Sequence, residues 1–151
     1  MTYAYKESYL YDAMRNLGEM TEYSHDACGI DCDEAFDYLV ASGLARRFEV
    51  GDPSVVCGMS GTELFREAAI KCGVRREEWP NAIVKYTTED YYWIGYILAL
   101  FQWKYNLSFQ NITGVIKTSD LLRMYPSLHT VSDDKATDSI MELYRQRTSV
   151  V

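Results

Sequence analysis

The sequence has little of the material from which most active sites are built. It contains two histidines, His25 and His129, and it has neither a phosphate-binding glycine loop nor a dinucleotide-binding fingerprint. Nucleophilic catalysis needs a serine, threonine or cysteine beside a base and an orienting acid. Ser127 stands two residues before His129, but we interpret both as residues packed in a loop after Pro126. The sequence therefore predicts that the protein is not an enzyme, and an enzyme built around His129 is the least favoured alternative.

Basic residues are scarce in the first sixty positions, where four of them stand against eleven acids. The remaining residues include eleven acids and eleven bases, so the net charge of −7 belongs entirely to the first two fifths of the chain. Such a field repels phosphate backbones and attracts basic partners. We therefore expect a protein partner with a basic surface, and we consider direct binding to nucleic acid unlikely.

No metal-binding motif is complete. His25, Cys28 and Cys32 lie close together, but a zinc site of this kind usually adds a second Cys-x-x-Cys or histidine pair. The acidic run 31–37 lacks the glycine and the distal glutamate of an EF-hand loop. We expect no cofactor and four free thiols in a reducing cytoplasm, and metal binding by the histidine and the two cysteines is the minor alternative.

Signals for export or membrane insertion are also missing. The chain does not begin with the basic and then apolar segments of a signal peptide. Its most hydrophobic stretch is too short and too rich in tyrosine for a membrane span. The sequence shows no repeat, low-complexity segment or domain boundary. We expect a cytoplasmic protein with one domain over residues 1–151.

The most hydrophobic stretch, residues 88–106, predicts a central helix. From position 91 to 105 only Gly95, Gln102 and Lys104 are neither apolar nor aromatic. A helix that is apolar on nearly every side must be covered on nearly every side. We therefore predict an all-α domain of about five to seven helices around it. Its expected N-cap is Thr87 or Thr88, and Glu89 and Asp90 are expected in the first turn.

Apolar spacing and capping residues predict the other helices. They cover residues 3–27, 32–42, 61–72, 109–116, 120–125 and 133–147. The expected N-caps are Asp31, Ser60, Ser108, Ser119 and Ser132, and the expected stops are Gly29, Gly43, Gly73 and Pro126. Residues 44–60 are predicted to be irregular, with a turn at 51–54. Residues 74–87 are predicted to form a charged link from which Trp79 folds back onto the core.

Gly95 interrupts the most hydrophobic helix, where glycine costs about 1 kcal/mol relative to alanine. The favoured explanation is the close approach of another helix, and a groove for a partner segment is the alternative.

The predicted partner-binding surface lies in the acidic part of the chain. Acids of the first helix fall off its apolar stripe, and further acids begin the second helix, either as an ordinary acidic helix start or as an extension of the same acidic face. Aromatic side chains are abundant, and such rings anchor many interfaces. The residues expected to contact a basic partner are Glu19, Glu22, Asp26, Asp33, Glu34, Asp37 and Trp79.

Four stretches carry a resemblance that spans nearly the whole chain. They read TYAYKESYLYDAMRNLGEM, FDYLVASGLARRFEVGDPSVVCGMSGTELF, YYWIGYILALFQWKY and LLRMYPSLH, and the most specific parts are GDPSVVCGMSG and YWIGYILALFQWKY. They are similar to a family of small acidic helical proteins from Gram-positive gut bacteria. That family is associated with operons that carry a small ADP-ribosyltransferase-like protein and a short helical companion, which resemble toxin–antitoxin loci. The resemblance implies an antitoxin-like, protein-binding role and brings no catalytic residues with it.

The main alternative is a transcriptional regulator with a helix-turn-helix. The short helices in residues 108–125 would supply the motif, and Lys104, Lys117 and Arg123 would contact phosphates. This hypothesis needs a basic stripe that the sequence barely offers.

Overall fold

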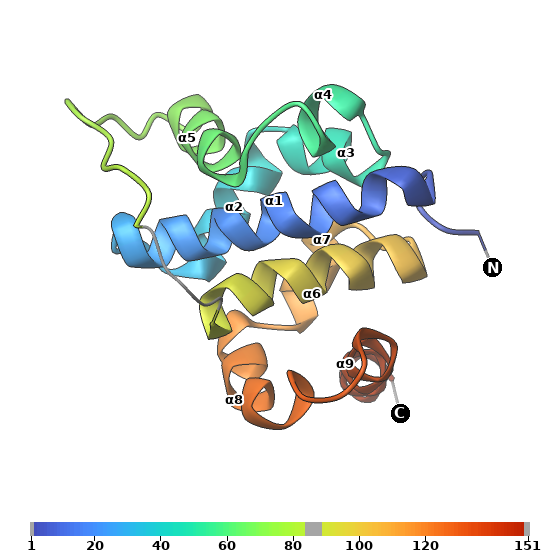
Figure 1. The fold of residues 1–151 in the computed structure, drawn as a ribbon. Helices are drawn as coiled ribbons and strands as arrows, with labels where there is room; N and C mark the ends of the chain where they lie inside the picture. Colours follow the sequence, from blue (N-terminus) through green and yellow to red (C-terminus); the bar gives the residue numbers. More distant parts are fainter. Residues whose placement is uncertain (1, 84–88, 150–151) are drawn as a thin grey trace.

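The computed structural model describes residues 2–83 and 89–149, and every regular element in these ranges is a helix (Figure 1). The predicted all-α class is confirmed, but the nine α-helices in the described residues exceed the five to seven expected. The elements are η1 (Glu7–Tyr9), α1 (Leu10–Glu22), the π-helical turn η2 (Tyr23–Ala27), α2 (Cys32–Ala41), α3 (Leu44–Glu49), α4 (Pro53–Val56), α5 (Gly61–Lys71), α6 (Asp90–Tyr105), α7 (Phe109–Val115), α8 (Thr118–Leu128) and α9 (Asp133–Thr148).

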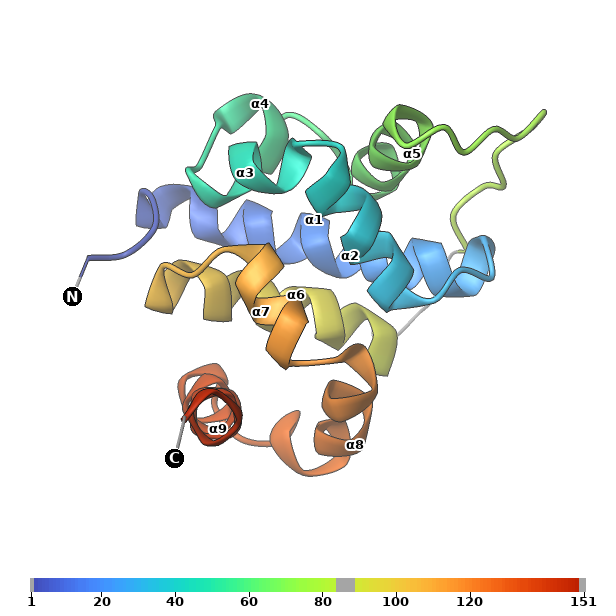
Figure 2. The same cartoon turned by 180° about the vertical axis from the view of Figure 1, so that it is seen from behind.

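Helices α1 and α6 lie side by side and antiparallel across the middle of the molecule (Figures 1 and 2). The predicted central helix is confirmed as α6, and ten of its sixteen residues are buried. The two threonines proposed as its cap lie outside the described residues. Glu89 occupies the N-cap position and makes no capping hydrogen bond with its side chain. Asn106 ends the helix in the left-handed conformation, with a φ of 52°.

The contact between α1 and α6 depends on Gly95. A Cβ atom at this position would lie 2.0 Å from the carbonyl oxygen of Leu17. The Oγ1 of Thr21 donates to the Tyr91 carbonyl oxygen at 2.6 Å and accepts from the Gly95 N–H at 3.1 Å. The favoured explanation of this glycine, close approach of another helix, is therefore confirmed.

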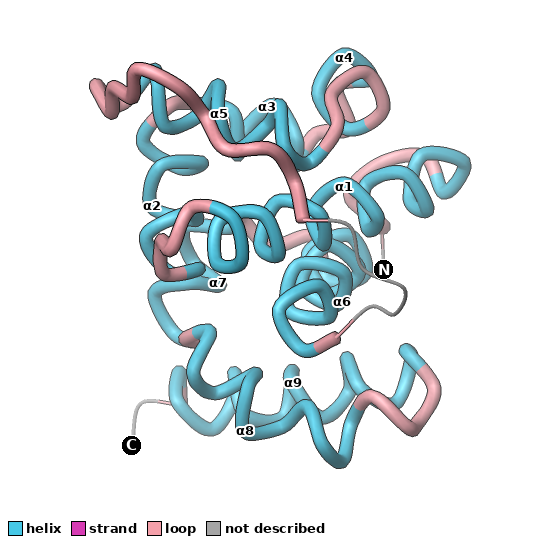
Figure 3. The backbone as a smooth tube through the Cα atoms, turned by 60° about the vertical axis from the view of Figure 1, so that its left-hand side comes forward, coloured by secondary structure: helices cyan, strands magenta, loops and turns pink. Residues whose placement is uncertain are grey.

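The remaining helices cover this central pair. Helices α2–α5 lie on one side of it and α8 and α9 lie on the other (Figures 1 and 2), while α7 contacts α2, α3 and α9. The tube view shows α6 almost end-on, with α8 and α9 along the opposite side from α5 (Figure 3). The buried apolar side chains of these helices form one cluster, whose largest fully buried members include Phe36, Phe48, Phe65, Phe101 and Phe109. No helix of the described residues is long and apolar enough to cross a membrane.

Residues 44–60 are mostly helical, so the prediction of an irregular segment is wrong. Gly43 and Gly51 take φ values of 85° and 75°, which glycine adopts without steric cost, and they delimit α3. Asp52 then caps α4 by accepting from the Ser54 N–H at 3.0 Å, with Pro53 in the first turn. The predicted turn at 51–54 is present, but it connects two short helices, α3 and α4, and is not part of a longer loop.

The predicted bounds of α8 are wrong at both ends. The N-cap is Lys117, whose N–H donates to Asp120 at 2.9 Å, and Ser119 lies inside the helix. Pro126 lies in the last turns and does not end the helix. Proline has a φ suited to a helix, but its nitrogen donates no hydrogen bond and its ring crowds the carbonyl four residues earlier, so contacts elsewhere must offset this cost. His129 is therefore the C-cap of α8, one turn after Tyr125, and not a residue of a loop.

Other boundaries are confirmed. Four predicted N-caps accept a hydrogen bond from the backbone of the first turn: Asp31 from Asp33, Ser60 from Glu63, Ser108 from Asn111 and Ser132 from Lys135. The first helix begins at residue 7, not at residue 3, and ends in the π turn. Residues 74–83 form no helix. Trp79 folds back as predicted, with its ring edge-on to Phe65 at a centroid distance of 6.2 Å.

Three helices also receive a carboxylate acceptor from a distant part of the chain. Glu19 accepts from the Gly61 N–H at the start of α5. Glu49 accepts from Phe109 at the start of α7, and Asp33 accepts from Thr118 at the start of α8. These bonds satisfy N–H groups that a helix leaves without an internal partner, and they place negative charge at the positive end of the helix dipole.

Candidate functional site

Three of the predicted contact residues, Glu19, Glu22 and Asp26, line one cleft of about 280 Å³. We call it the acidic cleft. It lies between α1 with its π turn, the start of α5 and the extended segment 74–83, and its other lining residues are Tyr23, Thr62, Ala82 and Ile83. The side chain of Ile83 is 51% exposed at its edge. The sequence correctly grouped these three acids on one helix, but it gave no sign of the opposite wall.

A hydrogen-bonded node holds the walls of the acidic cleft together. Tyr23 donates through its hydroxyl to the Pro80 carbonyl oxygen at 2.6 Å. Arg66 of α5 donates to both groups, to the Tyr23 hydroxyl at 3.1 Å and to the Pro80 carbonyl at 2.9 Å. Tyr23 is the first residue of the π turn that ends the first helix.

The remaining predicted contacts do not join this cleft. Asp33 accepts from the Thr118 N–H at 3.0 Å and so supports the start of α8. Asp37 lines a shallow hollow between α2 and α7, and Glu34 is exposed on α2. Trp79 is half-buried, and the guanidinium of Arg76 lies 5.3 Å from the centre of its ring. The structure thus separates the acids of α2 from those of α1.

The candidate metal ligands make other contacts. His25 stacks on Tyr91 at a centroid distance of 3.5 Å, and its Nδ1 lies 2.7 Å from Asp26. Cys32 is buried, and burial raises its pKa to about 12, which keeps the thiol protonated. All four cysteines are free thiols. Among the described residues, no three His, Cys, Asp or Glu side chains are grouped to hold a metal ion.

The bases proposed for DNA contact are all engaged within the molecule. Lys104 pairs with Asp134 and Asp138 of α9, each at 3.1 Å. Lys117 donates through Nζ to the Thr113 carbonyl oxygen, and Arg123 pairs with Asp120. These contacts compete with any use of the same groups for phosphate binding.

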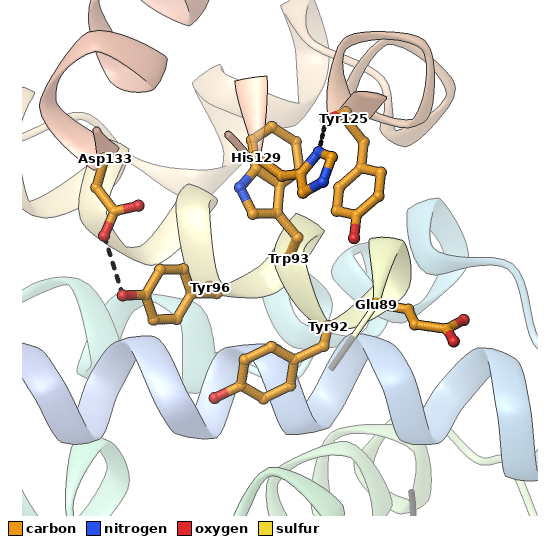
Figure 4. Close-up of a pocket in the computed structure, with 7 residues that line it drawn as sticks. All are labelled: Glu89, Tyr92, Trp93, Tyr96, Tyr125, His129 and Asp133. Atoms are coloured by element: carbon orange, nitrogen blue, oxygen red, sulfur yellow. Dashed lines mark hydrogen bonds between the residues drawn. The ribbon is translucent and has the colours of Figure 1, made fainter. Parts of the chain in front are cut away.

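A second site was not predicted from the sequence. It is a cavity of about 340 Å³ between α6, the end of α8 and the start of α9 (Figure 4). We call it the aromatic cavity. Its lining residues are Glu89, Tyr92, Trp93, Tyr96, Tyr125, His129 and Asp133.

The α6 wall of the aromatic cavity is a single helical face. Glu89, Tyr92, Trp93 and Tyr96 follow the spacing i, i+3, i+4, i+7, which places side chains on one side of a helix. This spacing is present in the sequence, but it is hidden because α6 is apolar all round. The opposite wall depends on the continuation of α8 past Pro126, which the sequence did not indicate.

Ring contacts fix the aromatic walls. Tyr125 makes an edge contact with Trp93 at a centroid distance of 5.6 Å and stacks on His129 at 4.2 Å. On the α6 side, Tyr92 and Tyr96 stack at 6.0 Å. Trp93 is 7% exposed, so the cavity reaches the hydrophobic core.

Two polar contacts orient the rim (Figure 4). The Tyr96 hydroxyl donates to Asp133 at 3.0 Å. Burial, together with this carboxylate, raises the pKa of Tyr96 to about 12, so the hydroxyl remains a donor at neutral pH. His129 places Nδ1 at 2.6 Å from the Tyr125 carbonyl oxygen, which can only accept, so Nδ1 carries the hydrogen. Ser127 donates to the Met124 carbonyl oxygen, so it is not directed at His129.

The two sites share their composition. Both combine carboxylates with aromatic or apolar side chains, and both are open to solvent. No protein-family model, curated protein or solved structure matches the chain. The resemblance to acidic helical proteins of Gram-positive gut bacteria therefore stays a prediction.

Proposed function

We propose that the protein is a cytoplasmic protein-binding module and acts as an antitoxin-like neutralising partner of a basic protein. The observation that carries this proposal is the position of the acidic excess, whose side chains are exposed or half-buried and lie outside the core. None of the eleven acids in the first sixty residues is buried. The helices α1–α4, which hold most of these acids, lie together, while the residues from 61 onward have no net charge.

An acidic excess of this kind favours association with a basic surface. Opposite charges steer two proteins toward a productive encounter and raise the association rate by about tenfold to a thousandfold at low salt. The four bases in this part of the chain are exposed or half-exposed, and Arg15 pairs with Asp12 and Arg47 with Asp52. These local pairs leave most of the acidic excess in place.

The first test is affinity capture of the tagged protein from its native host, at roughly 0.05 M and roughly 0.5 M salt. We expect one small basic protein that is retained at low salt and weakened at high salt. Recovery of no partner at either salt concentration would contradict the proposal.

The purified partner then allows a quantitative test by charge reversal. We expect Glu34→Lys with Asp37→Lys, both exposed on α2, to lower the association rate about tenfold at low salt. The matched control is Glu77→Lys with Glu142→Lys, which changes the net charge equally but lies in the neutral part of the chain. Stopped-flow kinetics over a salt series measure both. Equal rates for the two double variants would show that the acidic part of the surface does not guide the partner.

A further inference from the structure

The aromatic cavity differs from the acidic cleft because rings form most of its surface. The rings of Tyr92, Trp93 and Tyr96 on α6, together with two rings at the end of α8, line a volume of about 340 Å³. This is within the size range of ordinary ligand pockets. The faces of aromatic rings carry partial negative charge and attract cations placed over them. The walls of this cavity therefore suit a flat or rounded cation better than an anion.

The charged groups at the rim favour the same class of ligand. Glu89 and Asp133 are the two carboxylates of the lining, and none of the described residues that line the cavity is lysine or arginine. Asp133 lies in the first turn of α9, where the helix dipole favours negative charge. One carboxylate accepts several hydrogen bonds, so Asp133 can bind a ligand while it holds the Tyr96 hydroxyl.

The cavity also borders the acidic part of the surface. The ring of Tyr92 lies over Gly18 of α1, where a Cβ atom would come within 2.9 Å of it. Glu19 is the next residue along α1, and its carboxylate, after burial, is the main reason why the pKa of Tyr92 is raised. A basic partner guided to α1 would therefore meet the cavity directly beside it.

Among biological cations, the guanidinium group fits this arrangement best. It is planar, it stacks on aromatic rings, and it can bind a carboxylate through two parallel N–H donors. We propose that the aromatic cavity binds the side chain of an arginine presented by the basic partner. The inference rests on the proposed function and names the anchor of that interaction.

The test uses a small probe and needs no partner. N-acetyl-arginine amide is titrated into the isotopically labelled protein, with N-acetyl-citrulline amide as the neutral probe of the same shape. We expect NMR shifts concentrated at residues 89–96 and 125–133, and binding of the arginine probe about tenfold tighter than binding of the citrulline probe. Raising the salt concentration should weaken only the arginine probe.

Two pairs of variants assign the binding to the cavity. Asp133→Asn should weaken the arginine probe about tenfold, while Asp134→Asn should leave it unchanged. Asp134 is the next residue, loses the same charge, pairs with Lys104 and does not line the cavity. Tyr125→Leu should abolish the shifts, and Tyr125→Phe, which keeps the ring, should restore them. Far-ultraviolet circular dichroism confirms that each variant is folded.

The outcomes separate this inference from the proposed function. Equal binding of the two probes, or equal effects of the two aspartate variants, would overturn the arginine site even if a basic protein is captured at low salt. Arginine-specific shifts in the cavity would establish the site even if capture from the host yields no partner, and in that case only the proposed function would fail.

Discussion

Replacement of Gly95 by alanine is expected to lower the free energy of unfolding, measured by urea denaturation, by about 2 kcal/mol or more. The added Cβ would lie 2.0 Å from the Leu17 carbonyl oxygen and 2.6 Å from the Thr21 hydroxyl oxygen. Backbone atoms of a neighbouring helix cannot rotate away, so α1 and α6 must separate and lose packing along the whole contact. Overpacking of this kind costs about 1–3 kcal/mol or more, and the helix propensity of alanine returns only about 1 kcal/mol.

The chain supplies a matched control for this substitution. Gly114 also lies inside a helix, α7, but no atom comes within 4 Å of the position of its Cβ. Gly114→Ala is therefore expected to raise the free energy of unfolding by about 0.5–1 kcal/mol. If both alanine variants were as stable as the parent protein, the close contact between α1 and α6 would be wrong.

This contact also shows what the sequence was able to predict. A glycine in an otherwise apolar helix has few explanations, so Gly95 indicated a close helix contact without identifying α1 as the neighbour. The N-caps Asp31, Ser60, Ser108 and Ser132 were predictable because the capping interaction is local and involves residues within one turn. Apolar spacing and local capping residues therefore predicted most helices and most of their ends.

The errors arose where distant residues decide the outcome. A local rule treats Pro126 as a stop, but α8 packs against α6, and Asp120 in its first turn pairs with Arg147 of α9. We infer that these contacts offset the cost of the proline. The aromatic cavity needs that extra turn, because it positions His129 and leads to Asp133. The acidic cleft was half predicted, since the spacing in α1 gave one wall but nothing indicated segment 74–83 as the other.

Replacement of Asp120 by asparagine is expected to lower the free energy of unfolding by about 2–3 kcal/mol. This carboxylate is 5% exposed, and Arg147 of α9 binds both of its oxygens, with N–O distances of 2.6 Å and 2.9 Å. Loss of the negative charge leaves the arginine without its counter-ion and weakens the connection between α8 and α9. Thermal unfolding should show a melting temperature lower by about 5–10 °C for a chain of this size.

An exposed ion pair provides the comparison for the buried Asp120. Asp138 also pairs with a lysine, Lys104, but its side chain is 65% exposed. Solvent screens such a pair, so Asp138→Asn is expected to cost less than about 1 kcal/mol. Similar losses for both asparagine variants would mean that the burial of Asp120 has no energetic role.

The carboxylate of Asp120 should also make the stability of the protein depend on pH. Hydrogen bonds from Arg147 lower the pKa of Asp120 from 3.8 to about 2. Because the folded-state pKa is the lower one, the stabilisation is complete above about pH 4 and is lost as the pH falls toward 2. The difference in stability between the parent protein and Asp120→Asn should therefore be constant near neutral pH and narrow below about pH 4. A difference that widened with acid would have the wrong sign for this assignment.

The carboxylates that Glu19, Asp33 and Glu49 place at the starts of α5, α8 and α7 have a consequence for how the chain folds. A ribosome makes each acceptor before it makes the helix that the acceptor serves. Helices of seven to eleven residues are marginal alone, and these three gain this additional acceptor at their first turn only when the earlier part of the protein is present. The later helices are thus built onto a template made by the earlier ones. A fragment that begins at residue 89 would be expected to remain largely unfolded in solution.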